Sequence, residues 1–211
     1  MTALSEQARA MRVAARLLGY PDDALREDLP MLRAAAEKTG RSAEHLTAFC
    51  ERLAATPAAE AQAAYVDTFD LRRRCCLYLT YYSYGDTRKR GMALLRFTHA
   101  YKTAGYEILD GELPDHLAVV CEFTAAEPAA GGRLLAEHRV GVELLRMALA
   151  DARSPYLALL DGIRATLPAA TARDLDRAVA LAASGPPEEE VGLEPFGPPE
   201  VVGGGALGGR R

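Results

Sequence analysis

Tryptophan is absent from this 211-residue chain, and cysteine is scarce. The four cysteines, of which Cys75 and Cys76 are adjacent, do not make the disulfide framework that is typical of small secreted domains. The first twenty residues hold no long apolar run, because Glu6 and three arginines interrupt it. These absences predict a soluble protein of the reducing cytoplasm, without stable insertion into a membrane.

Sequence signatures of common catalytic sites are missing as well. The chain has no glycine-rich phosphate loop and no GxSxG, HExxH or CxxC motif, and its four histidines are scattered. Adjacent cysteine side chains diverge, so Cys75 and Cys76 are more typical of packing residues than of zinc ligands. We expect no enzyme activity, no metal and no cofactor. A thiol or metal enzyme ranks third among the functional hypotheses, behind the two described below.

Positive charge is concentrated in one segment of an otherwise acidic chain. The whole sequence has 25 basic and 29 acidic residues, whereas residues 65–102 hold eight basic and three acidic ones. Because aromatic residues are interleaved there, the alternative hypothesis is a helical nucleic-acid-binding protein that uses this segment. Helix-turn-helix and RNA-binding signatures are missing, however, and the net charge of -4 would repel phosphate at longer range. We therefore do not expect nucleic acid as a partner.

Apolar residues recur at helical spacing along most of the chain. In the first helix they are Leu4, Ala8, Met11, Ala15 and Leu18, and similar patterns follow in residues 117–124, 135–149 and 156–163. No segment shows a convincing alternation of apolar and polar residues. With 49% hydrophobic residues available for a core, the sequence predicts an all-α single domain of about seven to nine helices in residues 1–183.

Short polar residues mark where these helices should begin. The expected caps are Ser42, Thr56 before Pro57, Asp86, Asp115, and Thr171 with Asp174 as a capping box. Pro30 should kink or divide the second helix, and Gly105 should end another in a left-handed conformation. Residues 69–85 are expected to form an irregular or short-helical connection.

Residues 184–211 differ in composition from the rest. They hold five of the twelve prolines and eight of the eighteen glycines, so they bury too little to fold alone. We expect a disordered, acidic tail. Leu193 and Phe196, within GLEPFGPP, are apolar residues through which this tail could dock on the body.

Two motifs predict a surface that binds another protein. The first, YVDTFDLRRRCCLYLTYYSYGDTRKRG in residues 65–91, combines tyrosines and arginines, which are enriched where interfaces concentrate binding energy. The second, ELPDHL in residues 112–117, places two carboxylates and His116 beside apolar residues. As an acid–base pair it lacks a nucleophile, whereas as a docking edge it suits a polar or basic segment of a partner.

These motifs, with YKTAG between them and ELPDHLAVVCEF at the end, resemble the nitrate reductase delta-subunit family, the molybdenum cofactor assembly chaperones called NarJ. The resemblance is collinear from about Tyr65 to Phe123. One departure is Ala118, where the family usually has proline after ELPDHL. The wider family of all-helical redox-enzyme maturation proteins has a similar chain length and fold.

The resemblance implies a cytoplasmic, non-enzymatic chaperone. It would bind the N-terminal segment of the apo catalytic α subunit of respiratory nitrate reductase and assist insertion of the molybdenum cofactor. Proteins of molybdenum cofactor biosynthesis are further candidate partners. The candidate partner-binding residues join the family's motif positions to neighbouring aromatic residues: Tyr65, Phe69, Asp70, Arg72, Tyr81, Arg88, Arg90, Glu112, Leu113, Asp115, His116, Leu117 and Phe123.

Overall fold

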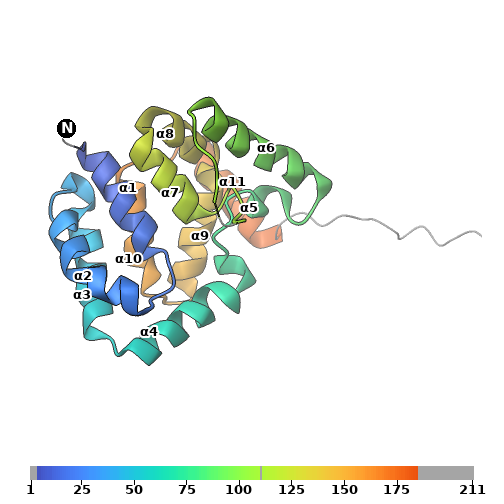
Figure 1. The fold of residues 1–211 in the computed structure, drawn as a ribbon. Helices are drawn as coiled ribbons and strands as arrows, with labels where there is room; N and C mark the ends of the chain where they lie inside the picture. Colours follow the sequence, from blue (N-terminus) through green and yellow to red (C-terminus); the bar gives the residue numbers. More distant parts are fainter. Residues whose placement is uncertain (1–3, 110, 185–211) are drawn as a thin grey trace, which may run out of the picture.

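A computed structural model describes residues 4–109 and 111–184, and these residues are helical without β-strands (Figure 1). Eleven α-helices lie in the described ranges, which confirms the all-α prediction. They are α1 (Glu6–Leu17), α2 (Asp23–Ala36), α3 (Ala43–Ala55), α4 (Ala58–Tyr65), α5 (Tyr81–Tyr84), α6 (Arg88–Thr103), α7 (Leu117–Ala126), α8 (Pro128–Glu137), α9 (Arg139–Asp151), α10 (Tyr156–Ala165) and α11 (Ala172–Ser184). The structure has more than the nine helices predicted, because the prediction did not count the very short α5 as a helix and did not separate α8 from α9.

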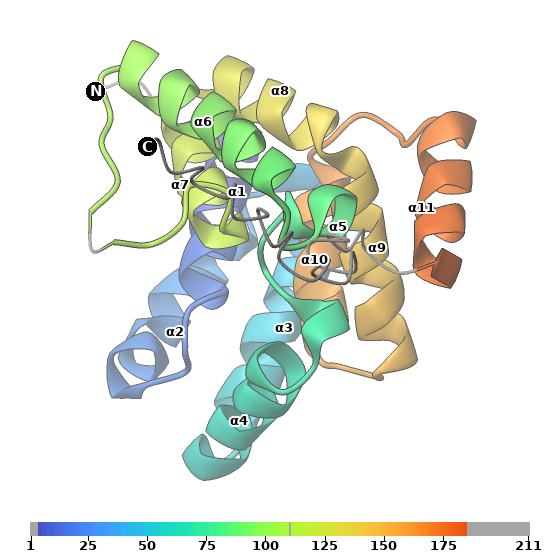
Figure 2. The same cartoon turned by 90° about the vertical axis from the view of Figure 1, so that its right-hand side faces the viewer.

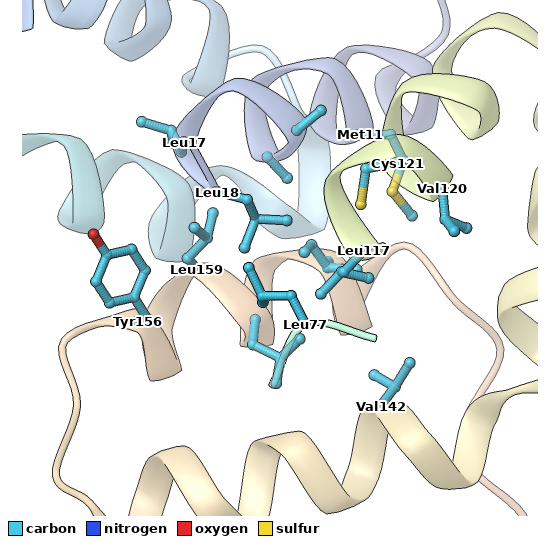
Figure 3. Close-up of a cluster of buried hydrophobic side chains, with 14 of the residues drawn as sticks. Met11, Leu17, Leu18, Leu77, Leu117, Val120, Cys121, Val142, Tyr156 and Leu159 are labelled. Atoms are coloured by element: carbon cyan, nitrogen blue, oxygen red, sulfur yellow. The ribbon is translucent and has the colours of Figure 1, made fainter. Parts of the chain in front are cut away.

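The core forms around α1, which packs against α7, α2 and α10. Met11 of α1 is fully buried and lies beside Cys121 of α7, and Leu117 of α7 and Leu77 lie below them in the same cluster (Figure 3). Burying one large aliphatic side chain contributes about 1.5–3 kcal/mol, so the central position of α1 is consistent with its strong apolar face. No helix in the described ranges has the length and hydropathy needed to cross a bilayer.

Pro30 does not divide the second helix, because α2 continues through it to Ala36. Pro30 is exposed, and on an exposed face solvent can satisfy the carbonyl group that a proline leaves unpaired. Gly105 has a φ of +85°, which confirms the left-handed helix end.

The predicted caps have mixed outcomes. Thr171 and Asp174 form the expected box: Asp174 accepts from the Thr171 N–H at 3.0 Å, and the Thr171 hydroxyl accepts from the Asp174 N–H at 3.2 Å. Ser42 precedes α3, but its hydroxyl donates to the Gly162 carbonyl at 2.7 Å instead of capping. The Thr56 hydroxyl bonds back to the end of α3.

The capping predictions for Asp86 and Asp115 were wrong. Helices α6 and α7 begin after Thr87 and His116, and neither Thr87 nor His116 makes a capping hydrogen bond with its side chain. Asp86 instead pairs with Arg73 and with Arg90 one turn further on, and Asp115 binds Thr80. The contacts to Arg73 and Thr80 join segments that are distant in sequence, which local sequence cannot reveal.

The connection between α4 and α6 is irregular, as predicted. It contains a π-helical turn η2 (Val66–Asp70), a 3-10 turn η3 (Arg73–Cys75) and α5; a further 3-10 turn, η1 (Gly40–Ser42), precedes α3. The connection crosses α9, where Gly141 permits close approach: a Cβ atom there would lie 2.7 Å from the Leu79 carbonyl oxygen. The predicted tail lies outside the described residues except for Ser184, the last residue of α11.

Candidate partner-binding site

The two sequence motifs meet through their backbones. The Leu79 N–H donates to the Asp115 carbonyl at 3.1 Å, and the Leu117 N–H donates to the Leu77 carbonyl at 2.8 Å. These bonds flank an isolated antiparallel bridge between Tyr78 and His116. The segment before α7 is therefore fixed against the connection that precedes α5.

The Asp115 side chain reinforces this junction from within. It is fully buried, and its Oδ2 accepts from the Thr80 N–H at 3.0 Å and from the Thr80 hydroxyl at 2.6 Å. The Arg90 guanidinium lies 3.8 Å from the same oxygen, and Arg90 Nε donates to the Thr80 hydroxyl at 3.2 Å. Asp115, Thr80 and Arg90 thus join the ELPDHL segment, the start of α5 and the first turn of α6.

Arg90 connects this buried junction to the surface. Its Nη1 lies 3.1 Å from Asp86, whose other oxygen pairs with Arg73 at 2.9 Å. The guanidinium carbon also lies 5.5 Å from the Tyr78 ring centroid and 5.9 Å from that of Tyr81. Cation–π contacts at such distances contribute about 0.5–1 kcal/mol where exposed and more when desolvated.

Several buried polar atoms in this cluster have no hydrogen-bond partner among the described residues. They are Arg90 Nη2, Asp115 Oδ1, His116 Nδ1 and, just before α6, Thr87 Oγ1. Buried polar groups are nearly always paired in folded proteins, and leaving one unpaired costs about 1–3 kcal/mol. These atoms have almost no exposure, so only water inside the junction or an opening of it would complete their hydrogen bonding.

The outer edge of the cluster is formed by Tyr78, Glu112 and His116. The Tyr78 hydroxyl donates to Glu112 at 3.3 Å, and the Tyr78 and His116 rings meet edge to face at 5.3 Å. Burial lowers the pKa of His116, although the negative charges of Glu112 and Asp115 oppose the shift. Leu113, 36% exposed, gives this edge an apolar side chain.

The thiols next to this site belong to the packing. Cys75 is buried and Cys76 is half-buried, and both are free. Burial raises the pKa of both thiols, which opposes formation of the reactive thiolate. In the described ranges, no three histidine, cysteine or acidic residues lie together as a metal site would need.

The remaining predicted residues lie in other surroundings. Tyr65 and Phe69 pack edge to face with Tyr156 of α10 in a separate aromatic cluster. Asp70 and Arg72 are exposed nearby, and Arg72 pairs with Asp67 at 2.9 Å. Leu117 and Phe123 are buried in the core. Apart from these two core residues, the candidates placed here form a cluster around Arg90, which includes Tyr81 and the edge at Glu112, and a second group beside α10.

Sequence reasoning missed residues that the fold brings to this place. Thr80 is not among the candidate residues although it lies inside the motif of residues 65–91, and Tyr78 belongs to the aromatic stretch of that motif without being a candidate on its own. It also missed a cavity of about 320 Å³ that opens beside Tyr81. Its walls come from η3, α5, α9 and α11, and include Arg73, Arg74, Tyr81, Leu144, Met147 and Leu181.

Comparison with known proteins gives consistent matches. Residues 23–161 match the family model described as nitrate reductase delta subunit. The nitrate reductase-like protein NarX of Mycobacterium tuberculosis is 45% identical over 123 residues, which are 58% of this chain and 18% of that protein. A Bacillus subtilis NarJ, named as a nitrate reductase molybdenum cofactor assembly chaperone, is 33% identical over 72% of this chain and 84% of its own length.

One further sequence relative and one solved structure also match. The Escherichia coli nitrate reductase molybdenum cofactor assembly chaperone NarJ is 32% identical over 55% of this chain, and the chain spans 51% of that relative's length. A solved structure from Archaeoglobus fulgidus, described as a redox enzyme maturation protein, superimposes with a TM-score of 0.58 at 23% identity. It covers 74% of this chain and 91% of the solved chain. At that identity the structural match supports the fold alone.

Proposed function

This chain belongs to the nitrate reductase delta subunit family, and on that premise we propose that it is a molybdenum cofactor assembly chaperone for nitrate reductase. The relatives from Bacillus subtilis and Escherichia coli are named as such chaperones and not as catalysts. The chaperone would act in the cytoplasm as one helical domain of residues 1–183. Its partner would be the apo α subunit, with proteins of molybdenum cofactor biosynthesis as further partners.

The observation that supports the proposal at the residue level is the junction of the two motifs at Tyr78 and His116, with Glu112 and Leu113 exposed at its edge. An extended or helical N-terminal segment of the α subunit has backbone and side-chain groups that could pair with the Glu112 carboxylate. Leu113 and the Tyr78 ring would supply apolar contact at the edge. In this proposal Glu112, Leu113 and His116 contact the partner, whereas Asp115, Leu117 and Phe123 hold the surface in place from within.

The Tyr65 and Phe69 group would act at a second place on the client, if it acts in binding at all, because it lies beside α10 and not in the Arg90 cluster. Asp70 and Arg72 are accessible there. We keep these four residues, together with Arg88, as proposed contacts that substitution can test separately from the Arg90 cluster.

Charge pairing weighs against the nucleic-acid alternative. Arg73 and Arg90 both pair with Asp86, and Arg72 pairs with Asp67, so three arginines of the basic segment already face carboxylates. Tyr81 and Tyr82 are buried and do not form an exposed platform for stacking bases. A protein partner therefore suits this surface better than a phosphate backbone.

Co-production of the cognate nitrate reductase with and without this chain tests the proposed function. The α subunit purified without the chain should hold much less molybdenum, while its amount and the iron–sulfur absorbance serve as controls for expression. Equal molybdenum content in both preparations would refute the proposal.

A further inference from the structure

The cavity beside Tyr81 combines positive charge with apolar walls. Arg73 and Arg74 lie at its rim, and Leu144, Met147 and Ala148 of α9 face Leu181 and Ala182 of α11 across it. Asp151 is the one acidic residue among its described lining residues. An adjoining hollow adds Arg72 to the same rim. A ligand for this groove should therefore carry negative charge next to an apolar group.

Arg74 is the available cation of this rim. Arg73 already pairs with Asp86 and lies 5.7 Å from the Tyr81 ring centroid. The Arg74 side chain is exposed and makes no hydrogen bond or ion pair within the described ranges, whereas its backbone carbonyl accepts from the Tyr82 hydroxyl at 2.9 Å. An anion can therefore bind Arg74 without breaking an existing pair.

The chain itself contains a segment of matching chemistry directly after α11. Residues 185–200, GPPEEEVGLEPFGPPE, carry five glutamates and no basic residue, with Leu193 and Phe196 as apolar side chains. Leu181 and Ala182 line the cavity, so the glutamate triplet begins only six residues beyond a wall of the groove. An extended chain advances about 3.3–3.6 Å per residue, which brings the whole segment within reach.

We infer that residues 188–196 bind in this cavity as an intramolecular ligand. The glutamates 188–190 contact Arg74 and the rim, and Phe196 or Leu193 packs against Met147 and Leu181. Tethering raises the local concentration of such a segment to about millimolar, so weak contacts suffice for occupancy. α11 packs against α9 at the edge of the fold (Figure 2), so the segment that follows α11 starts beside the cavity.

The absence of tryptophan from the chain provides a direct test. Phe196→Trp in the full chain creates a single tryptophan at the proposed anchor, and a peptide of residues 185–200 with the same substitution is the unbound reference. Relative to the peptide, the tryptophan of the full chain should have blue-shifted emission and should be quenched by acrylamide about twofold less. This follows because a millimolar local concentration of the segment implies that the cavity is occupied in much or all of the protein.

Variants at the rim identify the contact. Arg74→Glu in the Phe196→Trp chain should shift emission and quenching to those of the free peptide, and Arg74→Lys should largely preserve the burial. Arg41→Glu is the matched control, because Arg41 is an exposed arginine in η1 that lines none of the cavities described above. The inference would be overturned if the Phe196→Trp chain with Arg74 intact had the emission of the free peptide. Identical effects of Arg74→Glu and Arg41→Glu would overturn it as well. Burial that disappears on dilution would also overturn it, by showing that the segment binds a second copy.

Discussion

Asp115 accepts two hydrogen bonds from Thr80 through one carboxylate oxygen, from the backbone N–H at 3.0 Å and from the hydroxyl at 2.6 Å. The two residues are 35 positions apart in the sequence, and Arg90 donates to the same hydroxyl. Through this contact a carboxylate of the ELPDHL motif fixes the start of α5 and orients Arg90. The shape of the proposed binding surface therefore depends on a residue that is itself inaccessible.

Replacing Asp115 by alanine should destabilise the fold substantially. Thr80 would lose a charged acceptor and Arg90 a counter-charge, and hydrogen bonds to charged groups contribute about 1.5–3 kcal/mol each. We expect the free energy of unfolding in urea to fall by at least about 2 kcal/mol. Asp86→Ala is the matched control, since exposed ion pairs contribute about 0–1 kcal/mol. Equal losses for the two variants would contradict the structural role of Asp115.

Gly141→Ala should also destabilise the protein, because the new methyl group would lie 2.7 Å from the Leu79 carbonyl oxygen. That carbonyl belongs to the segment bonded to Asp115, so the connection must shift, at a cost of about 1–3 kcal/mol. Gly132→Ala in α8 is the control, because the nearest atom there is 4.0 Å away and alanine favours a helix. Thermal unfolding should show opposite shifts, and a stabilising Gly141→Ala would disprove the close packing.

The helices were predictable from sequence to the extent that local chemistry determines them. Apolar periodicity located the long helices, and the Thr171–Asp174 box formed as expected, because each depends on residues within one or two turns. Asp86 and Asp115 have the side chains of helix caps, yet their partners are Arg73, Arg90 and Thr80. The contacts of Asp86 with Arg73 and of Asp115 with Thr80 span 13 and 35 positions and depend on how the connection folds back, which no local pattern encodes.

The grouping of the candidate site was predictable only in part. The order of the motifs indicated that residues 65–91 and 112–117 belong together, and their backbones do meet at Tyr78 and His116. Tyr65 and Phe69 instead pack against Tyr156, because α4 and the π-helical turn η2 extend away from the Arg90 cluster. Aromatic residues that are close in sequence thus serve two separate places.

Stability should decrease as the pH falls through about 6.5, the ordinary pKa of histidine. Burial lowers the pKa of His116 and of His138 in the folded protein, so the unfolded chain binds protons first and acid favours unfolding. The loss of stability is complete once the pH lies below the pKa values that His116 and His138 have in the folded protein. His116→Gln should flatten the dependence of the urea midpoint between pH 7.5 and 5.5, with His138 accounting for the rest. An unchanged slope would show that His116 titrates normally.

The four thiols should react slowly in the native protein. Burial raises the pKa of Cys50 to about 11 and raises the pKa of Cys75, Cys76 and Cys121 as well. Mass spectrometry after iodoacetamide treatment at pH 8 should find Cys76 modified first, because it is only half-buried, and all four modified rapidly in urea. Native labelling of Cys75 or Cys76 as fast as free cysteine would revive the thiol-enzyme hypothesis.

The central claim is tested most directly by isothermal titration of the full chain with a peptide of the N-terminal residues of the cognate nitrate reductase α subunit. We expect saturable binding with a Kd of about 1 μM or tighter, equivalent to about 8 kcal/mol. Leu113→Asp at the edge of the Arg90 cluster should weaken binding about tenfold or more, or about 1.4 kcal/mol, whereas Met31→Asp on the exposed face of α2 should not change it. Absence of binding, or equal loss in both variants, would contradict the proposed surface.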